Sequence, residues 1–140
     1  MQPWVVHAFV AMMFAGVTTV IAKQGLAGIS AELGIGVRTL FVTLFVMIFV
    51  AFSVPLEEVR TIRRESLLWL VASAFTTAVS WIYYYKALKD GDIATVALID
   101  KGSTVVAVLL AWWWLKEVLT LRIVIGAGLV LLGLLIISRK

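Results

Sequence analysis

Five long apolar segments dominate the sequence, at about residues 4–22, 37–54, 66–88, 93–115 and 121–137. A helix needs about 20 mostly apolar residues to cross the hydrocarbon core of a bilayer. Of the 140 residues, 63% are hydrophobic and 14% are charged, whereas an ordinary soluble domain has about 45–50% and about 25%. The sequence therefore predicts an all-α, polytopic membrane protein with five transmembrane helices, forming a single domain over residues 1–140.

Composition also narrows the chemistry. The chain has no cysteine and one histidine, and it contains no HExxH-type spacing. Disulfides, thiol nucleophiles and zinc sites therefore have no ligands to build on. No glycine-rich loop follows a strand-like run, so nucleotide binding has no support. The formal charge of +4 is small and scattered, which points to loops beside anionic lipid head groups and away from nucleic acid. We expect no enzymatic activity, no cofactor and no metal.

Lysine and arginine are divided almost equally between the two faces that five spans would create. Six fall on one face, five on the other, and Lys101 falls within the fourth span. The six include Arg139 and Lys140. Because an excess of these residues normally fixes the cytoplasmic face, so small a bias predicts insertion in both orientations. Two oppositely inserted copies would form an inverted repeat, from which many secondary transporters build a midplane site. Alternatively, the cluster at residues 60–64 fixes one topology.

Small side chains recur at helical spacing in the first, third and fourth spans, whereas the second span is mostly bulky. Lipid provides no hydrophobic drive between helices, so close packing relies on small residues. We therefore expect spans one, three and four to pack inside and span two to face lipid. The hydroxyl groups along this seam either serve packing alone or line a weakly polar cavity. They belong to Thr18, Thr19, Ser73, Thr76, Thr77, Ser80, Ser103 and Thr104.

Three other side chains admit both a structural and a functional interpretation. Trp81 and Tyr84 lie near one end of the third span, where aromatic residues commonly form an interfacial belt. They could also stack on a ligand. His7 lies about one turn inside the first span. It is a candidate proton relay, and the alternative is a histidine that forms hydrogen bonds near the membrane surface.

Two charges interrupt the fourth span, in the stretch "VALIDKGSTVV". On insertion scales a charge at a helix centre costs about 2.5–3.5 kcal/mol, so Asp100 and Lys101 need compensation. Adjacent helical residues point in different directions, so we expect each to find its partner elsewhere, on hydroxyls or on a second copy. In an antiparallel pair, Asp100 of one copy could meet Lys101 of the other twice over. Gly102 would loosen the helix. The couple is interpreted as a proton switch or substrate anchor, or as a structural ion pair.

The sequence also resembles a known family. The segment "YYYKALKDGDIATVALIDKGSTVVAVLLAWWWLKEVLTLRIVIGAGLVLLGLLII" resembles the C-terminal part of the EamA domain, the repeat unit of the drug/metabolite transporter superfamily. The likeness rests on the "KALK-G" exit of the third span, the small-residue fourth span, the "KE-LT" turn with Glu117 and the glycine-marked last span. The N-terminal half is looser, with Lys23 ending the first span and Arg38 opening the second as in the family.

The resemblance implies a function. Typical members carry two repeats, so this single repeat, which is similar to the small bacterial and archaeal branch, implies a homodimer that makes one pathway for a small metabolite or drug-like solute in the inner (plasma) membrane. Asp100 would be its proton-sensitive carboxylate, Lys101 the counter-charge, and Trp81 and Tyr84 solute contacts. Many ten-span members have proline where this chain has "IDKGS", so their substrates do not transfer. The alternative is a non-transporting scaffold or accessory subunit.

Overall fold

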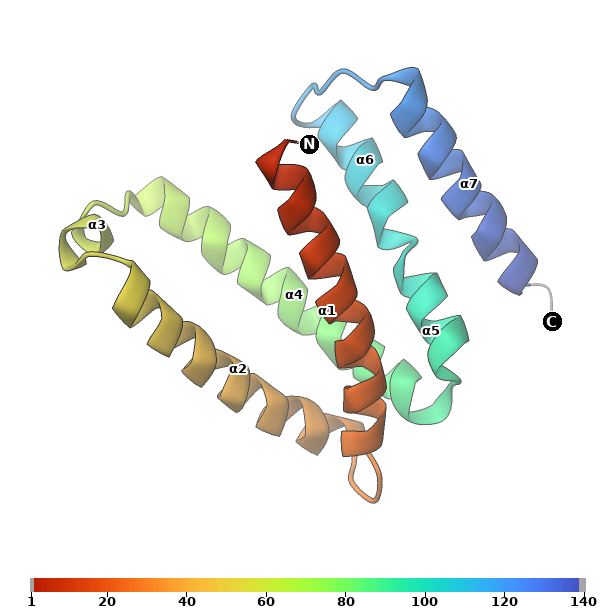
Figure 1. Ribbon diagram of the computed structural model, residues 1–140, viewed down its shortest axis with the longest axis horizontal. Helices are drawn as coiled ribbons and strands as arrows, with labels where there is room; N and C mark the ends of the chain where they lie inside the picture. The colour runs from red at the N-terminus through yellow and green to blue at the C-terminus, as the bar shows by residue number, and fades with distance from the viewer. Residues whose placement is uncertain (1, 139–140) are drawn as a thin grey trace. The chain divides into compact units, whose positions relative to one another are not determined.

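The computed structural model describes residues 2–138, and Arg139 and Lys140 lie outside the described residues. Seven helices follow one another in that range: α1 (Pro3–Gly25), α2 (Ala31–Ser53), α3 (Leu56–Arg60), α4 (Arg64–Asp90), α5 (Ile93–Asp100), α6 (Ser103–Trp113) and α7 (Leu121–Ser138) (Figure 1). By length and composition α1, α2, α4 and the Ile93–Trp113 segment can each cross a membrane, and Leu121–Ile137 is a shorter apolar helix. The all-α membrane fold is confirmed for four spans, and the fifth stays a prediction.

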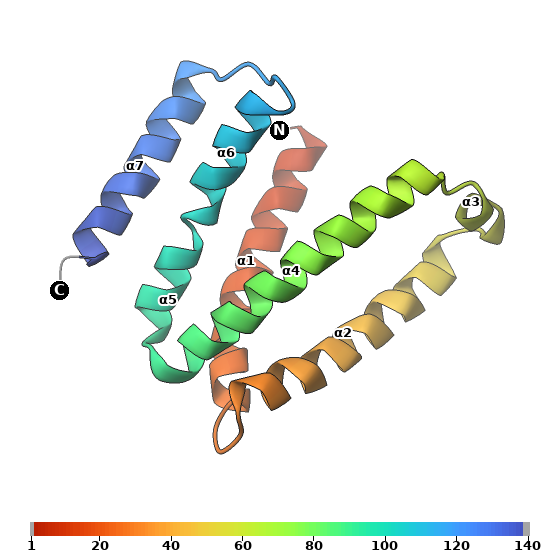
Figure 2. The same cartoon turned by 180° about the vertical axis from the view of Figure 1, so that it is seen from behind.

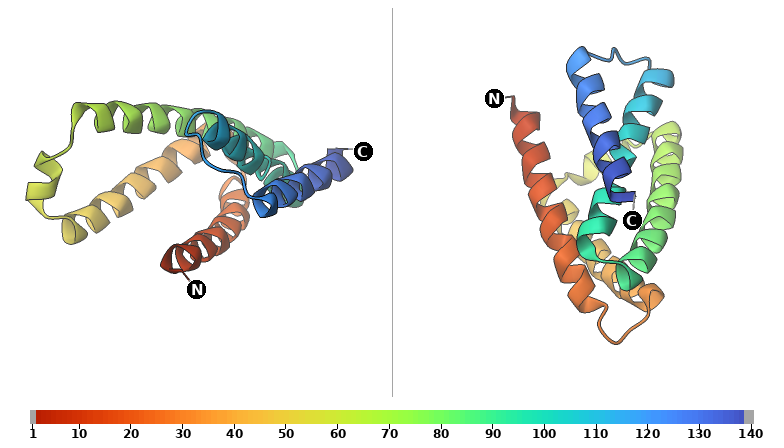
Figure 3. Two further views of the ribbon diagram at one scale, coloured as in Figure 1. Left: turned by 90° about the horizontal axis from the view of Figure 1, so that it is seen from above. Right: turned by 90° about the vertical axis from the view of Figure 1, so that its right-hand side faces the viewer.

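The chain forms two compact units. The central unit consists of residues 22–90, and the terminal unit contains the residues up to Ile21 together with those from Gly91 onward. In the central unit α2 and α4 lie side by side and are joined by the short helix α3, as the views in Figures 1, 2 and 3 agree. In the terminal unit both α5 and α6 contact α7.

Helix α2 begins at Ala31 and not at residue 37 as predicted. Ser30 caps it, because its side-chain oxygen accepts the amide hydrogen of Leu33 at 3.2 Å, and Glu32 in the first turn suits the positive end of the helix dipole. Gly34 and Gly36 made this stretch look like a loop. Gly34 instead gives Leu26 room, since a Cβ atom there would overlap the Leu26 side chain.

The packing role of α2 differs from the prediction. Its large side chains are exposed, Phe45 and Phe49 by 64% and 68%, as a lipid-facing surface requires. Its other side packs against α4, so α2 is not a purely peripheral span. Sequence spacing showed the bulky side of α2 but not the side that contacts α4. That contact includes charged and aromatic side chains, since Arg38 lies over Trp81 and Glu32 pairs with Lys86.

A lysine clasp closes one end of the central unit. Lys23 Nζ donates to the carbonyl oxygens of Leu88 at 2.6 Å and Lys89 at 3.0 Å. In return Lys89 Nζ donates to the carbonyl oxygens of Leu26 at 2.9 Å and Ile29 at 2.8 Å. The last carbonyls of a helix have no partner within it, so Lys23 satisfies such groups at the end of α4, while Lys89 binds carbonyls of the loop that follows α1. Beside the clasp lie the buried residues of this unit, Leu26, Ala31, Tyr85 and Leu88.

The fourth predicted span is interrupted, as the glycine suggested. Between α5 and α6 the amide groups bond three residues back: Lys101 to Leu98 at 3.1 Å and Gly102 to Ile99 at 2.9 Å. Such tighter turns inside a helix often mark a hinge. The missing side chain at Gly102 also lets α7 approach closely, since an added Cβ atom would lie 2.9 Å from a methyl carbon of Leu134. The interruption therefore lies where the two charges are.

Candidate functional site

The terminal unit places Asp100 and Lys101 at the interruption between α5 and α6. Lys101 Nζ lies 3.7 Å from Asp100 Oδ2, so the two form an ion pair, contrary to our expectation that neighbours on a helix would not meet. The expectation assumed a regular helix. Asp100 is the last residue of α5 and Lys101 is its C-cap, which frees the lysine stem to fold back toward the carboxylate. The side chains remain 55% and 38% exposed for Lys101 and Asp100.

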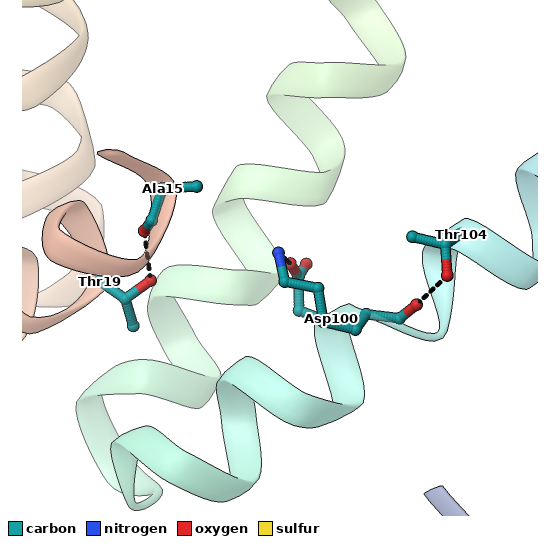
Figure 4. Close-up of polar contacts among 5 residues, drawn as sticks. Ala15, Thr19, Asp100 and Thr104 are labelled. Atoms are coloured by element: carbon teal, nitrogen blue, oxygen red, sulfur yellow. Dashed lines mark hydrogen bonds and ion pairs between the residues drawn. The ribbon is translucent and has the colours of Figure 1, made fainter. Parts of the chain in front are cut away.

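The hydroxyl of Thr104 supports the interruption. Its Oγ1 donates to the carbonyl oxygen of Lys101 at 2.6 Å, and Figure 4 shows Asp100 and Thr104 on the two sides of the turn. Ser103 opens α6 and is exposed. The predicted residues at positions 100, 101, 103 and 104 are thus gathered around one turn.

The predicted α1 residues of the terminal unit show less. Thr18 and His7 are exposed, and neither side chain forms a hydrogen bond or an ion pair with another described residue. It is the neighbouring Thr19 whose hydroxyl donates to a carbonyl, that of Ala15, at 3.1 Å (Figure 4). The proposed pathway role of Thr18 and the proton-relay role of His7 therefore stay predictions.

A groove of about 840 Å³ runs between α2 and α4 in the central unit, and three predicted residues line it, Ser73, Thr77 and Trp81. The Thr77 hydroxyl donates to the carbonyl oxygen of Ser73, also in the wall, at 2.8 Å. Ser80 is exposed and outside the wall. Tyr84 packs its ring against Tyr85, with ring centres 6.4 Å apart.

Four residues without an assigned role in the sequence analysis belong to or adjoin this groove: Glu32 is in its wall, and Arg38, Tyr85 and Lys86 lie outside the wall. Arg38 places its guanidinium 4.4 Å from the ring centre of Trp81 and 5.9 Å from that of Tyr85. Glu32 lines the groove and pairs with Lys86 at 3.2 Å. The signal that could have revealed them is the N-cap at Ser30. With α2 starting there, Arg38 lies inside a span and not at its entrance.

The known proteins place these features in a family. Residues 2–139 match the EamA-like transporter family. The chain belongs to this family. It is 31% identical over 137 residues to an uncharacterized transporter in the cobO 3′ region of a Sinorhizobium species, and the match covers 98% of this chain and 97% of the relative. No solved structure matches the chain. The family match and the relative identify the chain as a multi-pass membrane protein of a transporter family. This confirms the resemblance to the EamA domain found in the sequence.

Proposed function

We propose that two copies of this chain form one secondary carrier for a small organic solute in the bacterial plasma membrane. The observation that carries the proposal is the Asp100–Lys101 pair at the interruption of the fourth span. Secondary transporters bind solutes and coupling ions at interrupted helices near the bilayer midplane. Ionisable residues inside a membrane are expensive, and they commonly mark proton relays and solute pathways. Membership of a transporter family supports the same conclusion.

Five spans and one EamA-like domain complete the proposed carrier subunit. Helix α7 has 18 residues and is about 27 Å long at 1.5 Å per residue, close to the hydrocarbon thickness of about 30 Å. An odd number of spans puts the two ends of the chain on opposite faces. Together with the even distribution of Lys and Arg, this supports insertion in both orientations and an antiparallel homodimer.

The exposure of the charge pair supports assembly. Asp100 is 38% and Lys101 55% exposed in the single chain, which is unfavourable for charged groups facing lipid. A second copy that covers the turn would shield both groups, and an exchange of ion pairs between copies would leave none unpaired. In this arrangement Asp100 is the proton-sensitive carboxylate and Lys101 its counter-charge.

Uptake by purified protein tests the function. The chain alone is reconstituted in liposomes with an imposed pH gradient, and uptake of a panel of radiolabelled organic solutes is compared with protein-free liposomes. We expect gradient-driven accumulation of at least one solute, and we expect the Asp100→Asn variant to assemble normally but to lose that accumulation. Unchanged accumulation in Asp100→Asn would reduce Asp100 to a structural role. A folded protein that moves no solute would favour the scaffold or accessory subunit.

A further inference from the structure

Arg38 lies about 10 Å inside α2, since that helix starts at Ala31 and rises about 1.5 Å per residue. Its guanidinium lies over the ring of Trp81 at 4.4 Å, with Tyr85 at 5.9 Å. Aromatic faces attract cations through the negative face of the ring. Arg38 is therefore held in place by two rings of α4 rather than by a charge of opposite sign.

Other cations near the spans differ from Arg38 in their partners. Lys86 pairs with Glu32, and Lys101 pairs with Asp100. The two lysines of the clasp each donate to backbone carbonyl oxygens. Within residues 2–138, by contrast, Arg38 has neither a carboxylate within ion-pair distance nor a hydrogen-bond acceptor. An intramembrane cation in this state is costly, and it retains one positive charge for a partner from outside the chain.

The stacking geometry leaves Arg38 able to bind that partner. A guanidinium group has five N–H donors in its own plane, so contact of its flat face with a ring does not use them. Carboxylates and phosphates accept two parallel hydrogen bonds from such a group. Arg38 therefore has a fixed position and N–H donors that are available to an anion.

The groove supplies the rest of the site. Trp81 both lines the groove and carries Arg38. The walls are mainly apolar, with hydroxyls at Thr39, Thr43, Ser73 and Thr77. The volume of about 840 Å³ falls within the range of about 300–1,000 Å³ that is typical of small-molecule sites. The one carboxylate in the wall, Glu32, is already paired with Lys86. The unpaired charge beside the wall residue Trp81 is therefore the positive charge of Arg38.

We propose that the α2–α4 groove binds an amphiphilic organic anion, with its carboxylate or phosphate on Arg38 and its apolar body between the two helices. The ligand is a solute of the carrier, and this part of the inference rests on the proposed function. A neutral or cationic molecule of the same shape would leave Arg38 unsatisfied. The groove therefore selects by charge at one end and by apolar volume along its length.

A charge series on one molecular frame tests the proposal. The protein is placed in nanodiscs of zwitterionic phosphatidylcholine, and binding of radiolabelled phenylbutyrate is measured by scintillation proximity. Unlabelled phenylbutyrate should compete, whereas phenylbutyramide and phenylbutylamine should compete about 10-fold less or worse, because hydrogen bonds to charged groups contribute about 1.5–3 kcal/mol. Preferential competition by the amine, or equal competition by all three, would overturn the assignment without any variant being made.

Variants locate the binding. Arg38→Gln should weaken phenylbutyrate binding about 10- to 100-fold, and Arg38→Lys should fall between the two because a lysine cannot bind bidentately. Arg60→Gln, in the exposed helix α3, removes the same charge and should bind as the wild type does. Equal affinity of wild type and Arg38→Gln would contradict the site.

Nanodiscs that contain an anionic lipid show whether the ligand of the groove is a solute or a membrane lipid. Replacing a third of the phosphatidylcholine by anionic phosphatidylglycerol should leave phenylbutyrate affinity within about 2-fold if the ligand is a solute. Loss of phenylbutyrate binding in those discs, in the wild type and in Arg60→Gln alike, would assign the groove to lipid instead. Binding is measured without flux, so phenylbutyrate that binds but is not transported would contradict the carrier and leave the site intact.

Discussion

Two sites inside the predicted spans solve the problem of an intramembrane charge differently. At the interruption of the fourth span, Asp100 and Lys101 neutralise each other at 3.7 Å, and the backbone around them has lost its regular helical bonds. In α2 the helix is continuous, and Arg38 rests on aromatic rings with its charge unpaired. The first site needs no ligand and has a backbone that can move. The second has a fixed backbone and needs an anion.

This difference suggests a division of labour, with recognition at Arg38 and proton-linked movement at Asp100. The clasp of Lys23 and Lys89 fixes the chain near Arg38 through four hydrogen bonds. The turn at Lys101 and Gly102 is supported by contacts between near neighbours in the chain, namely three-residue backbone bonds and the hydroxyl of Thr104. A substitution at one site should therefore leave the function of the other unchanged.

Charge reversal at the recognition site should have the largest effect. In Arg38→Glu, the anion would meet a like charge, which costs several kcal/mol, so phenylbutyrate affinity should fall by about 100-fold or more and phenylbutylamine should become the better competitor. Asp100→Asn, as the matched change at the other site, should leave phenylbutyrate affinity within about 2-fold in the same discs. Equal losses in both variants would show that recognition and coupling are one site.

Removing one lysine of the clasp should have the second-largest effect, a loss of stability. Lys89→Met removes the ammonium donor from the carbonyl oxygens of Leu26 and Ile29, so the free energy of unfolding should fall by about 1–2 kcal/mol. Unfolding is followed in mixed detergent by circular dichroism. Lys86→Met removes an exposed ion pair and should change the same quantity by less than about 1 kcal/mol. A larger loss in Lys86→Met would indicate that the clasp does not fix this end.

A methyl group at the interruption should slow movement with a modest change in stability. In Gly102→Ala the new Cβ atom would lie 2.9 Å from Leu134 and 3.0 Å from the carbonyl oxygen of Ile99, so overpacking should destabilise by about 1 kcal/mol or more. Turnover in liposomes should fall, while phenylbutyrate binding is retained.

Gly126→Ala provides the matched control, because a Cβ atom at Gly126 has open space around it. Alanine is favoured over glycine inside a helix, so this variant should be as stable as the wild type or slightly more so. Turnover that falls equally in both variants would show that the effect comes from stiffer helices in general and not from the turn.

Breaking the exposed pair at the groove should have the smallest effect. Glu32→Gln removes the partner of Lys86 while both side chains are more than half exposed. The melting temperature should be unchanged, and phenylbutyrate should bind as tightly or up to about 2-fold more tightly, because a nearby negative charge is lost in a screened position. Weaker binding in Glu32→Gln would mean that the carboxylate itself takes part in recognition.

Much of the fold follows from the sequence because bilayer thickness constrains it. The positions of α1, α4 and the fourth span follow from apolar length alone, and the turn at Gly102 follows from glycine beside two charges. The start of α2 did not follow, because Gly34 and Gly36 look like loop residues unless the cap at Ser30 and the close contact with Leu26 are known. Local composition does not show which side chain packs against a glycine.

The sequence predicted only part of the candidate sites, because their contacts depend on helix ends and on packing between helices. Asp100 and Lys101 stand out because they interrupt an apolar run, but their pairing depends on where α5 ends. Arg38 stands near the start of the second predicted span, and the sequence analysis gave it no role beyond opening that span as in the family. Its role depends on Trp81 and Tyr85, which are more than forty positions away in the chain, and such long-range contacts are set by packing of α2 on α4.

In the proposed antiparallel homodimer, identical copies of a single repeat insert in both directions and build one carrier. The chain has no cysteine, so a single cysteine at Ala27, an exposed position between α1 and α2, reports its own side of the membrane. Intact cells are labelled with a membrane-impermeant maleimide, and again after permeabilisation. About half of the Ala27→Cys protein should be labelled from outside. Complete labelling, or none, would contradict the antiparallel homodimer and require an oppositely oriented partner protein.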